Sequence, residues 1–256
     1  ASFKKEGGAF IGQVKAYVSE PEDNCVRNVS VAEFLPSNAK NGDICVLTKK
    51  KSDVTLKDLG LGSSVLIKEN GVDREYIVFS NVTRHSGKTE LIRKNLLNSS
   101  VIFEKSNKNG YPQSDIDMFL NSVFISSLDE SVRSKLTDAL VEPNISRKVY
   151  IASREELSNF NYFEGNTLKA QTDSGNNSVY WTRTPAGESS VYCYNTAGES
   201  AIFGATESRC VRPVIVLPCD ICVENADTGS GMGYRLLDGM GGIYIFKNGE
   251  WSECEL

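Results

Sequence analysis

Residues 178–220 read SVYWTRTPAGESSVYCYNTAGESAIFGATESRCVRPVIVLPCD, and this stretch carries the clearest pattern in the chain. Short β-rich runs alternate with tight turns that contain glycine, which predicts an antiparallel meander. The last run, 211–218, is almost continuously apolar, as expected of a strand that is buried on both faces. Because Pro213 has no N–H to donate, it should lie at the start of that strand or at a bulge.

The residues before this stretch predict two helices. The first covers 114–124, with Ser114 as its N-cap and one apolar stripe. The second starts at Ser127 and stops at Pro143. The stripes consist of Ile116, Phe119, Leu120, Val123 and Phe124 in the first helix, and of Leu128, Val132, Leu136 and Leu140 in the second.

Shorter signals surround the helices. Asn70-Gly71 separates two β-rich runs, 64–68 and 74–80, and is the strongest short signal for a hairpin. A strand is predicted over 148–152, and Ser153 with Glu156 caps one more short helix. The order of strands, helices and strands predicts an α+β fold.

The chain is divided into three parts by its composition. We expect a β-containing extension over 1–62, with strands at 13–18 and 43–48, for attachment or oligomerisation. The main domain is expected over 63–223. A Gly- and Asp-rich linker then leads into a small hairpin unit within 224–256, with its turn at 247–250.

The composition excludes several classes of protein. A net charge of −5 without a basic stretch argues against a nucleic-acid partner, and no apolar run is long enough to insert into a membrane. Seven cysteines, an odd number in a chain of 256 residues, indicate synthesis in a reducing compartment. Cys219 and Cys222 form a lone CxxC, and with a single histidine we expect neither a metal nor a cofactor.

Three further motifs lack the context that their chemistry requires. The GKT at 87–89 would need another glycine at position 82, where the chain has Val82. The EPN tripeptide at 142–144 follows a predicted helix, away from the strands to which the lectin motif belongs. His85 stands in a polar loop without a nucleophile motif nearby.

Five segments in order resemble a known family. They read SVLIKENGVDREYIVFS at 64–80, YPQSDIDMFLNSVF at 111–124, KVYIASREEL at 148–157, YWTRTP at 180–185 and CVRPVIVLP at 210–218. The order resembles an uncharacterised α+β domain that recurs in tail and surface proteins of phages and prophages of Gram-positive bacteria. The ending is also similar to C-type-lectin-like folds, including the formylglycine-generating type and the variable proteins of diversity-generating retroelements. This resemblance implies two helices that flank small twisted antiparallel sheets, with one face displayed for binding.

The resemblance also implies a function. We expect a non-enzymatic receptor-binding protein of a phage, prophage or tailocin tail tip, which recognises a bacterial surface glycan or protein. Such a protein is made in the bacterial cytoplasm, acts in a virion tail or on an extracellular surface, contacts other tail proteins and can form a homotrimer. One alternative is a structural tail or baseplate component without a receptor. Another is a formylglycine-generating or cell-wall-acting enzyme, which would need Cys193 and Cys210 to form a reactive pair.

The candidate ligand-binding residues lie in the meander. Tyr192 and Tyr194 share one face of a strand, and exposed aromatic side chains suit sugars and protein partners. Arg183 and Arg209, on neighbouring strands, could grip an anionic group, as could Arg212. The alternatives are packing of the aromatics and structural pairing of the arginines with an acid such as Asp117 or Glu155. The full set is Trp181, Arg183, Tyr192, Tyr194, Asn195 and Arg209, with Trp181 favoured as a core residue and Arg212 as a structural one.

Overall fold

The computed structural model describes residues 4–6, 9–11, 29–32, 40, 43–47, 54–81, 87–106, 108–163, 167–237, 242–247 and 250–253. Contacts group the chain into two units. Unit 1 comprises 1–51 together with 238–256, and unit 2 comprises 52–237. The main domain expected over 63–223 therefore lies inside unit 2.

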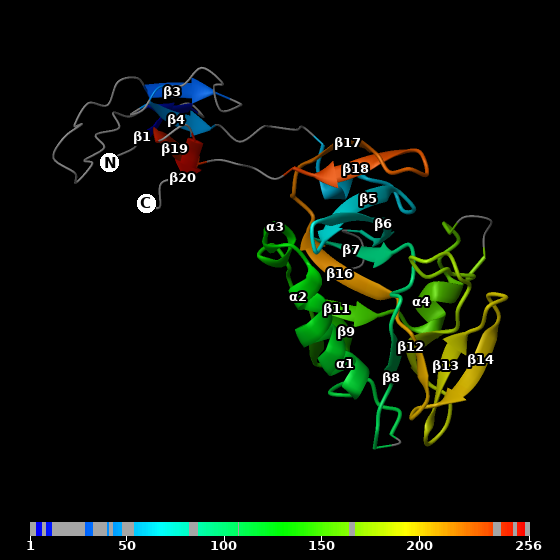
Figure 1. Cartoon of the computed structure of the whole chain (residues 1–256). Coiled ribbons are helices and arrows are strands. Elements are labelled where there is room, and N and C mark those ends of the chain that lie inside the picture. The colour runs from blue at the N-terminus through cyan, green and yellow to red at the C-terminus, as the bar shows by residue number, and fades with distance from the viewer. Residues whose placement is uncertain are drawn as a thin grey trace. The chain divides into compact units, whose positions relative to one another are not determined.

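Unit 1 joins strands from the two ends of the chain in one sheet of order β20-β19-β4-β3 (Figure 1). Its strands are β3 (Val29–Ala32), β4 (Ile44–Leu47), β19 (Gly242–Lys247) and β20 (Glu250–Glu253), and a separate hairpin pairs β1 (Lys4–Glu6) with β2 (Ala9–Ile11). The strands predicted at 43–48 and in the C-terminal hairpin are confirmed. β4 and β19 pair antiparallel, so the two extensions expected at opposite ends share a sheet. The strand predicted at 13–18 lies outside the described residues.

A seven-stranded sheet forms the centre of unit 2 (Figure 1). In spatial order its strands are β11 (Val149–Ile151), β16 (Pro213–Pro218), β7 (Lys88–Arg93), β6 (Val72–Ser80), β5 (Ser64–Glu69), β18 (Met232–Leu236) and β17 (Val223–Asp227). All neighbours are antiparallel except β18 and β5. β16 lies between two partners and is buried up to Leu217, and Pro213 is its first residue, so both predictions for this strand are confirmed.

The hairpin between β5 and β6 is also as predicted. Asn70 has φ 49° and Gly71 has φ 76°. Positive φ at both central residues is the requirement of a type I′ turn, which matches the twist of the flanking strands.

Most of the stretch 178–220 belongs to a five-stranded sheet. Its order is β14 (Ser200–Gly204), β13 (Ser190–Tyr194), β12 (Tyr180–Pro185), β15 (Ser208–Cys210) and β8 (Ser100–Ile102). β12, β13 and β14 form the predicted antiparallel meander. β15 instead pairs parallel with β12, and β16 leaves for the seven-stranded sheet, so the stretch spans two sheets.

The first predicted helix is present as one continuous helical segment. It consists of α1 (Asp115–Phe119), a π-helical turn η2 (Leu120–Phe124) and α2 (Ile125–Ser127), and Ser114 Oγ accepts from Asp117 N at 3.3 Å. Ile116, Leu120 and Phe124 are buried, whereas Val123 is 62% exposed. Ile116, Leu120 and Phe124 are four residues apart and share one face, as in any helix. Val123, seven residues after Ile116, is turned off that face because the i→i+5 bonds of the π turn fit more residues into each turn.

The second predicted helix is wrong beyond one turn, α3 (Glu130–Arg133). The chain continues as a hairpin of β9 (Ala139–Glu142) and β10 (Ile145–Arg147), in which Asn144 has φ 65°. Leu140, expected to face inward, is 53% exposed, because strand geometry buries its neighbours Ala139 and Val141 instead.

The expected α+β, C-type-lectin-like fold is therefore wrong. Among the described residues the chain is mainly β and its helices are short, and unit 2 contains one longer helical segment there in place of the two flanking helices that were expected. Most of the buried apolar side chains of unit 2 form one cluster that takes members from both sheets. Within the described ranges, no helix has the length and apolar character that crossing a membrane requires.

Candidate functional site

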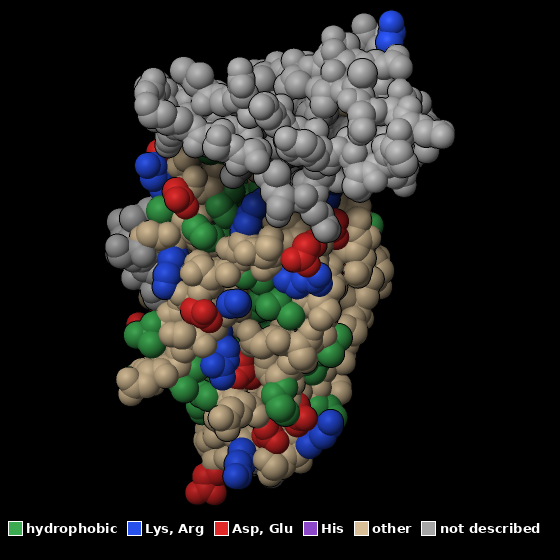
Figure 2. Space-filling model, turned by 90° about the vertical axis from the view of Figure 1, so that its left-hand side faces the viewer, with side chains coloured by type: hydrophobic (Ala, Val, Ile, Leu, Met, Phe, Trp, Pro, Cys, Tyr) green, Lys and Arg blue, Asp and Glu red, His purple; other side chains and the backbone are tan. Residues whose placement is uncertain are grey.

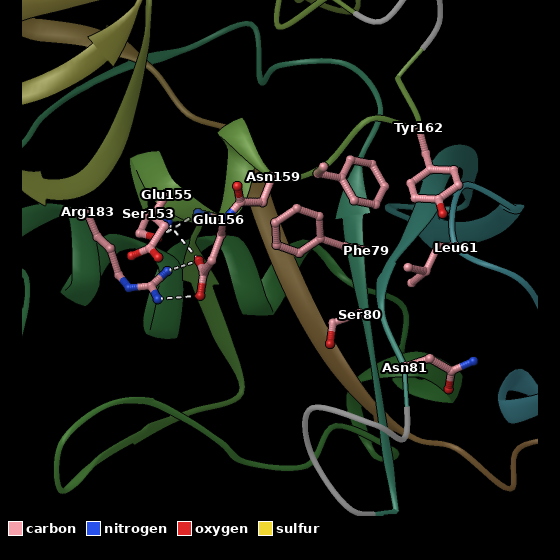
Figure 3. A pocket seen from close by; sticks show the side chains of 11 residues that line it. Leu61, Phe79, Ser80, Asn81, Ser153, Glu155, Glu156, Asn159, Tyr162 and Arg183 are labelled. Carbon is pink, nitrogen blue, oxygen red and sulfur yellow. Dashed lines mark hydrogen bonds and ion pairs between the residues drawn. The ribbon is translucent and has the colours of Figure 1, made fainter.

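A hollow of about 500 Å³ opens on unit 2 where four segments meet (Figure 3). These segments are the turn after η1 (Leu56–Asp58), the end of β6, α4 (Arg154–Ser158) with the loop that follows it, and β12. The lining residues are Leu61, Phe79, Ser80, Asn81, Ser153, Glu155, Glu156, Asn159, Phe160, Tyr162 and Arg183. Figure 3 shows Ser153, Glu155, Glu156 and Arg183 gathered at one end, and Tyr162 and Leu61 at the other.

The polar end is built on an ion pair between Arg183 and Glu156. The Arg183 side chain is buried, and its Nη1 and Nη2 each bond one oxygen of the Glu156 carboxylate, Nη2 to Oε1 at 2.6 Å. Nη1 also donates to the carbonyl of Ile151 at 3.0 Å, and Nη2 to that of Val141 at 3.2 Å. This is the structural pairing considered for Arg183, with Glu156 as the acid. The guanidinium charge is therefore already matched inside the protein.

A capping box at the start of α4 fixes the position of Glu156. Ser153 Oγ accepts from Glu156 N at 3.1 Å, and Glu156 Oε2 accepts from Ser153 N at 2.8 Å. This confirms the cap predicted from the sequence. The adjacent Glu155 is exposed and has no ion-pair partner within the described parts of the chain.

The other end of the hollow is aromatic. The ring centroid of Phe160 lies 4.9 Å from that of Phe79, 5.3 Å from that of Tyr162 and 4.8 Å from that of Phe163. Three of these rings are buried, and Tyr162 is 53% exposed. The ring of Tyr162 is thus accessible to a ligand while it packs against buried aromatic side chains.

The backbone under Tyr162 requires glycine. Gly62 has φ +85°, and a Cβ at this position would lie 2.8 Å from the Cβ of Tyr162. Gly62 N also donates to the carbonyl of Val78 at 2.9 Å, which holds the turn against β6. The turn before β5 and the aromatic loop are therefore in direct contact.

Asn81 joins this turn to the sheet. Its Nδ2 donates to the carbonyls of Lys57 at 3.1 Å and Leu59 at 2.9 Å, and its Oδ1 accepts from Thr89 Oγ1 at 3.2 Å. These bonds fix the floor of the hollow at the end of β6.

The predicted aromatic residues are mostly structural. Trp181 is 1% exposed, and its Nε1 donates to the Val101 carbonyl at 2.8 Å, so its favoured core role is confirmed. Tyr194 is also buried, with its hydroxyl 2.8 Å from Ser158 Oγ. Tyr192 is half-buried, and the Arg154 guanidinium lies 4.5 Å from its ring centroid.

The predicted polar residues do not come together. Arg209 stacks on Phe203 at 4.1 Å and pairs with Glu207. Asn195 Oδ1 accepts from the backbone of Ala197 at 2.9 Å and Glu199 at 3.0 Å, which closes the turn between β13 and β14.

Arg212 has the structural role favoured for it. It is buried, its Nε and Nη2 donate to the carbonyls of Arg93 and Lys94, and it stacks on Phe163 at 3.9 Å. Burial lowers the pKa of its guanidinium.

Of the six candidates, only Arg183 lines the hollow. The aromatic wall was not among the predicted site residues, although Phe160-Asn161-Tyr162-Phe163 places three aromatic residues within four positions. Phe79 and Asn81 carry no such signal, because they reach the hollow only through the folding of β6.

The two meander cysteines do not form a reactive pair. Cys193 is opposite Trp181 on one side of β12, and Cys210 is opposite Tyr180 on the other. Two strand spacings are about 9–10 Å, more than the roughly 4.4–6.8 Å between Cα atoms that a disulfide needs. Burial raises the pKa of the Cys193 thiol far above its usual range, which favours the unreactive form.

A second hollow of about 490 Å³ lies beside the helical segment and β10. Its central acid, Asp117, is buried and accepts from Arg147 Nη2 at 2.6 Å, from Asn121 Nδ2 at 3.0 Å and from Gln113 N at 2.9 Å. The Asp117 carboxylate is thus already hydrogen-bonded within the protein. The first hollow is therefore the better candidate for a ligand site.

The charges on the face shown in Figure 2 do not mark a second site among the described residues. Figure 2 shows one face on which Lys and Arg side chains are interspersed with Asp and Glu, without a region of one sign. Across the ranges that the structure describes, no group of three His, Cys, Asp or Glu side chains is arranged to hold a metal ion.

The fold and the hollow define a mainly β module with an aromatic-and-polar pocket beside its central sheet. The chain belongs to the DUF6273 family, described as a domain of unknown function, whose model matches residues 86–219. No curated protein and no solved structure matches the chain. The matched range includes α4, the aromatic loop and β12, whereas Leu61, Phe79, Ser80 and Asn81 precede it. The family domain thus supplies one wall of the hollow, and the preceding hairpin supplies the other.

Proposed function

We propose that unit 2 is a non-enzymatic binding module that takes a carbohydrate of a bacterial cell surface into the hollow of Figure 3. The observation that carries this proposal is the exposed ring of Tyr162, which lies on buried Phe160 and faces a hollow whose other end is polar. A sugar ring has an apolar face that stacks on an aromatic ring and hydroxyl groups that need hydrogen-bond partners.

The polar groups around the hollow suit such a ligand. Ser153 and Asn159, which cap the two ends of α4, line it together with Glu155 from within the helix, and Ser80 lines it from β6. Ligand sites in proteins typically combine an apolar wall with a few convergent polar groups that set orientation. A volume of about 500 Å³ lies within the usual range of small-molecule sites.

The biological setting of the proposal rests on the sequence resemblance. The five ordered segments over 64–218 support a receptor-binding protein of a phage, prophage or tailocin tail, which acts outside the cell that makes it. In that setting the ligand is a glycan of a Gram-positive cell surface. Unit 1 is then the part that contacts other tail proteins or forms a trimer.

The test is binding of the fluorescently labelled full chain to intact Gram-positive cells from a broad strain panel. Tyr162→Ala should weaken saturable binding by at least about tenfold, as expected for loss of a central aromatic contact. Tyr192→Ala, which removes a tyrosine outside the hollow, should leave binding unchanged. Both variants are compared with the parent chain by thermal melting. Binding by no form of the protein, or loss only in Tyr192→Ala, would overturn the proposal.

A second candidate is a structural tail or baseplate component without a receptor. It is favoured by β14, which is an edge strand of the five-stranded sheet and carries Ile202 at 54% exposure. Edge strands with apolar side chains can pair with another chain. Self-association that is lost in Ile202→Lys, with cell binding absent throughout, would favour this candidate over the first.

A further inference from the structure

The charged side chains that line the hollow do not cancel one another. This imbalance indicates which class of ligand the proposed site takes. Its charged lining residues are Glu155, Glu156 and Arg183. Glu156 and Arg183 neutralise each other through a two-point ion pair in which both side chains are nearly buried. One carboxylate, Glu155, is left uncompensated among the described lining residues.

The same ion pair argues against an anionic ligand. All contacts of the Arg183 guanidinium described above are made to the protein: to the Glu156 carboxylate and to two backbone carbonyls. An incoming carboxylate or phosphate would have to displace Glu156, which also caps α4. Breaking a buried pair of this kind is strongly unfavourable. Arg183 therefore lines the hollow without serving as a binding group for an anionic ligand.

The positions of the side chains suggest how a ligand lies. Figure 3 shows Glu155 at the end with Arg183, and Tyr162 at the other end. A saccharide that stacks on Tyr162 therefore extends its far end toward the Glu155 carboxylate. A ligand group that meets Glu155 gains by carrying a positive charge, and one with a negative charge is repelled.

We propose that the hollow selects a saccharide with a free, protonated amino group, held by stacking on Tyr162 and by charge pairing with Glu155. This inference rests on the proposed carbohydrate-binding function and names the class of sugar. The ligand is an amino sugar that lacks the N-acetyl group, and no covalent step is involved.

The size of the effect follows from the exposure of Glu155. Exposed ion pairs contribute modestly, so we expect the charged sugar to bind about two- to fivefold more tightly than its neutral counterpart. The preference should shrink as salt is raised, because exposed charges are screened within about 10 Å at 0.1 M ionic strength.

The test compares two probes that differ only in the amino group, a tetramer of glucosamine and a tetramer of N-acetylglucosamine. Binding to the full chain is measured by calorimetry at about pH 6, where a primary amine is protonated. Glu155→Gln removes the charge and keeps the shape. Glu188→Gln removes an exposed charge outside the hollow and is the matched control. Tyr162→Ala tests stacking.

The expected result has three parts. The glucosamine tetramer binds more tightly to the parent chain and to Glu188→Gln, the preference disappears in Glu155→Gln while binding persists, and Tyr162→Ala weakens both probes. Equal binding of the probes, or a preference for the N-acetylated one, overturns the inference and leaves the carbohydrate-binding proposal standing. Binding of neither probe also overturns the inference. If intact cells are not bound either, the proposed function falls with it.

Discussion

Arg93 connects three parts of unit 2 through one buried guanidinium. It is 1% exposed, and it forms two-point pairs with Glu69 on β5 and with Asp173 in the loop before β12. Its Nη1 also donates to the carbonyls of Asn95 and Leu96. Tyr76 adds a bond to Glu69 at 2.6 Å. All the donors of an arginine side chain are thus used within the protein.

Arg93→Met should destabilise unit 2 by about 3–5 kcal/mol, because the largely buried Glu69 and Asp173 carboxylates would remain without their counter-charge. Urea unfolding followed by fluorescence measures the change. Arg133→Met is the control, since Arg133 pairs with Glu130 at the surface and should cost no more than about 1 kcal/mol. Equal effects of the two substitutions would show that the buried network adds no stability.

Cys193 should resist alkylation in the native protein. Burial raises the pKa of its thiol, so the thiolate that reacts is scarce even at pH 9. Half-exposed Cys222 should react with iodoacetamide well before it. Peptide mass spectrometry after timed labelling separates the two, and labelling in denaturant should make their rates equal. Rapid native labelling of Cys193 would contradict its buried position.

Among the elements, the turn between η1 and β5 does most to position the candidate site. It brings Leu61 to the hollow, places Gly62 against Tyr162, and is held by Asn81 at the end of β6. The sequence predicts the boundary between the extension and the main domain here, between residues 62 and 63. In the structure this turn is one wall of the hollow, because the hydrogen bonds of β6 draw it onto the aromatic loop.

Gly62→Ala should lower both stability and ligand binding. A methyl group at this position meets Tyr162 at 2.8 Å in a backbone conformation that disfavours alanine, so we expect a loss of at least about 2–3 kcal/mol and a displaced Tyr162 ring. Gly175→Ala is a matched control, because Gly175 has the same φ of +85° with nothing within 4 Å. It should cost only about 1 kcal/mol. Thermal unfolding of both variants gives the comparison, and equal losses would show that the contact with Tyr162 is unimportant.

At the scale of the whole molecule, each unit gathers strands that lie far apart in the sequence. Unit 2 adds β5 and β6 before the family match and β17 and β18 after it to the same seven-stranded sheet. Leu56 and Leu59, before residue 63, and Leu236, after residue 223, belong to its core. Domain ends drawn at 63 and 223 would cut through this core.

A fragment covering 52–237 should therefore unfold cooperatively at nearly the temperature of unit 2 in the full chain. A fragment covering 63–223 should melt at least about 10 °C lower, because it loses several buried leucines and leaves β5 as an open edge. Differential scanning calorimetry of the two fragments and the full chain decides this. Equal melting temperatures would place the true boundary at 63–223.

The sequence by itself determined the features that depend on near neighbours. The Asn70-Gly71 turn, the caps at Ser114 and Ser153, and the burial of β16 were all correctly predicted. Each follows from a preference that acts over a few residues, such as positive φ, a side chain that bonds an open N–H, or a continuous apolar run.

Only the tertiary structure decided which strands are partners and where the hollow lies. The spacing of Leu128 and Leu140 fits a helix, yet the end of that segment, Ala139–Glu142, pairs in a β-hairpin. Tyr162 and Phe79 are far apart in the chain, and their rings meet around Phe160 only after β6 and the loop after α4 have packed. Such contacts depend on the choice among competing long-range pairings, and that choice is made by the burial of the whole core rather than by any local preference.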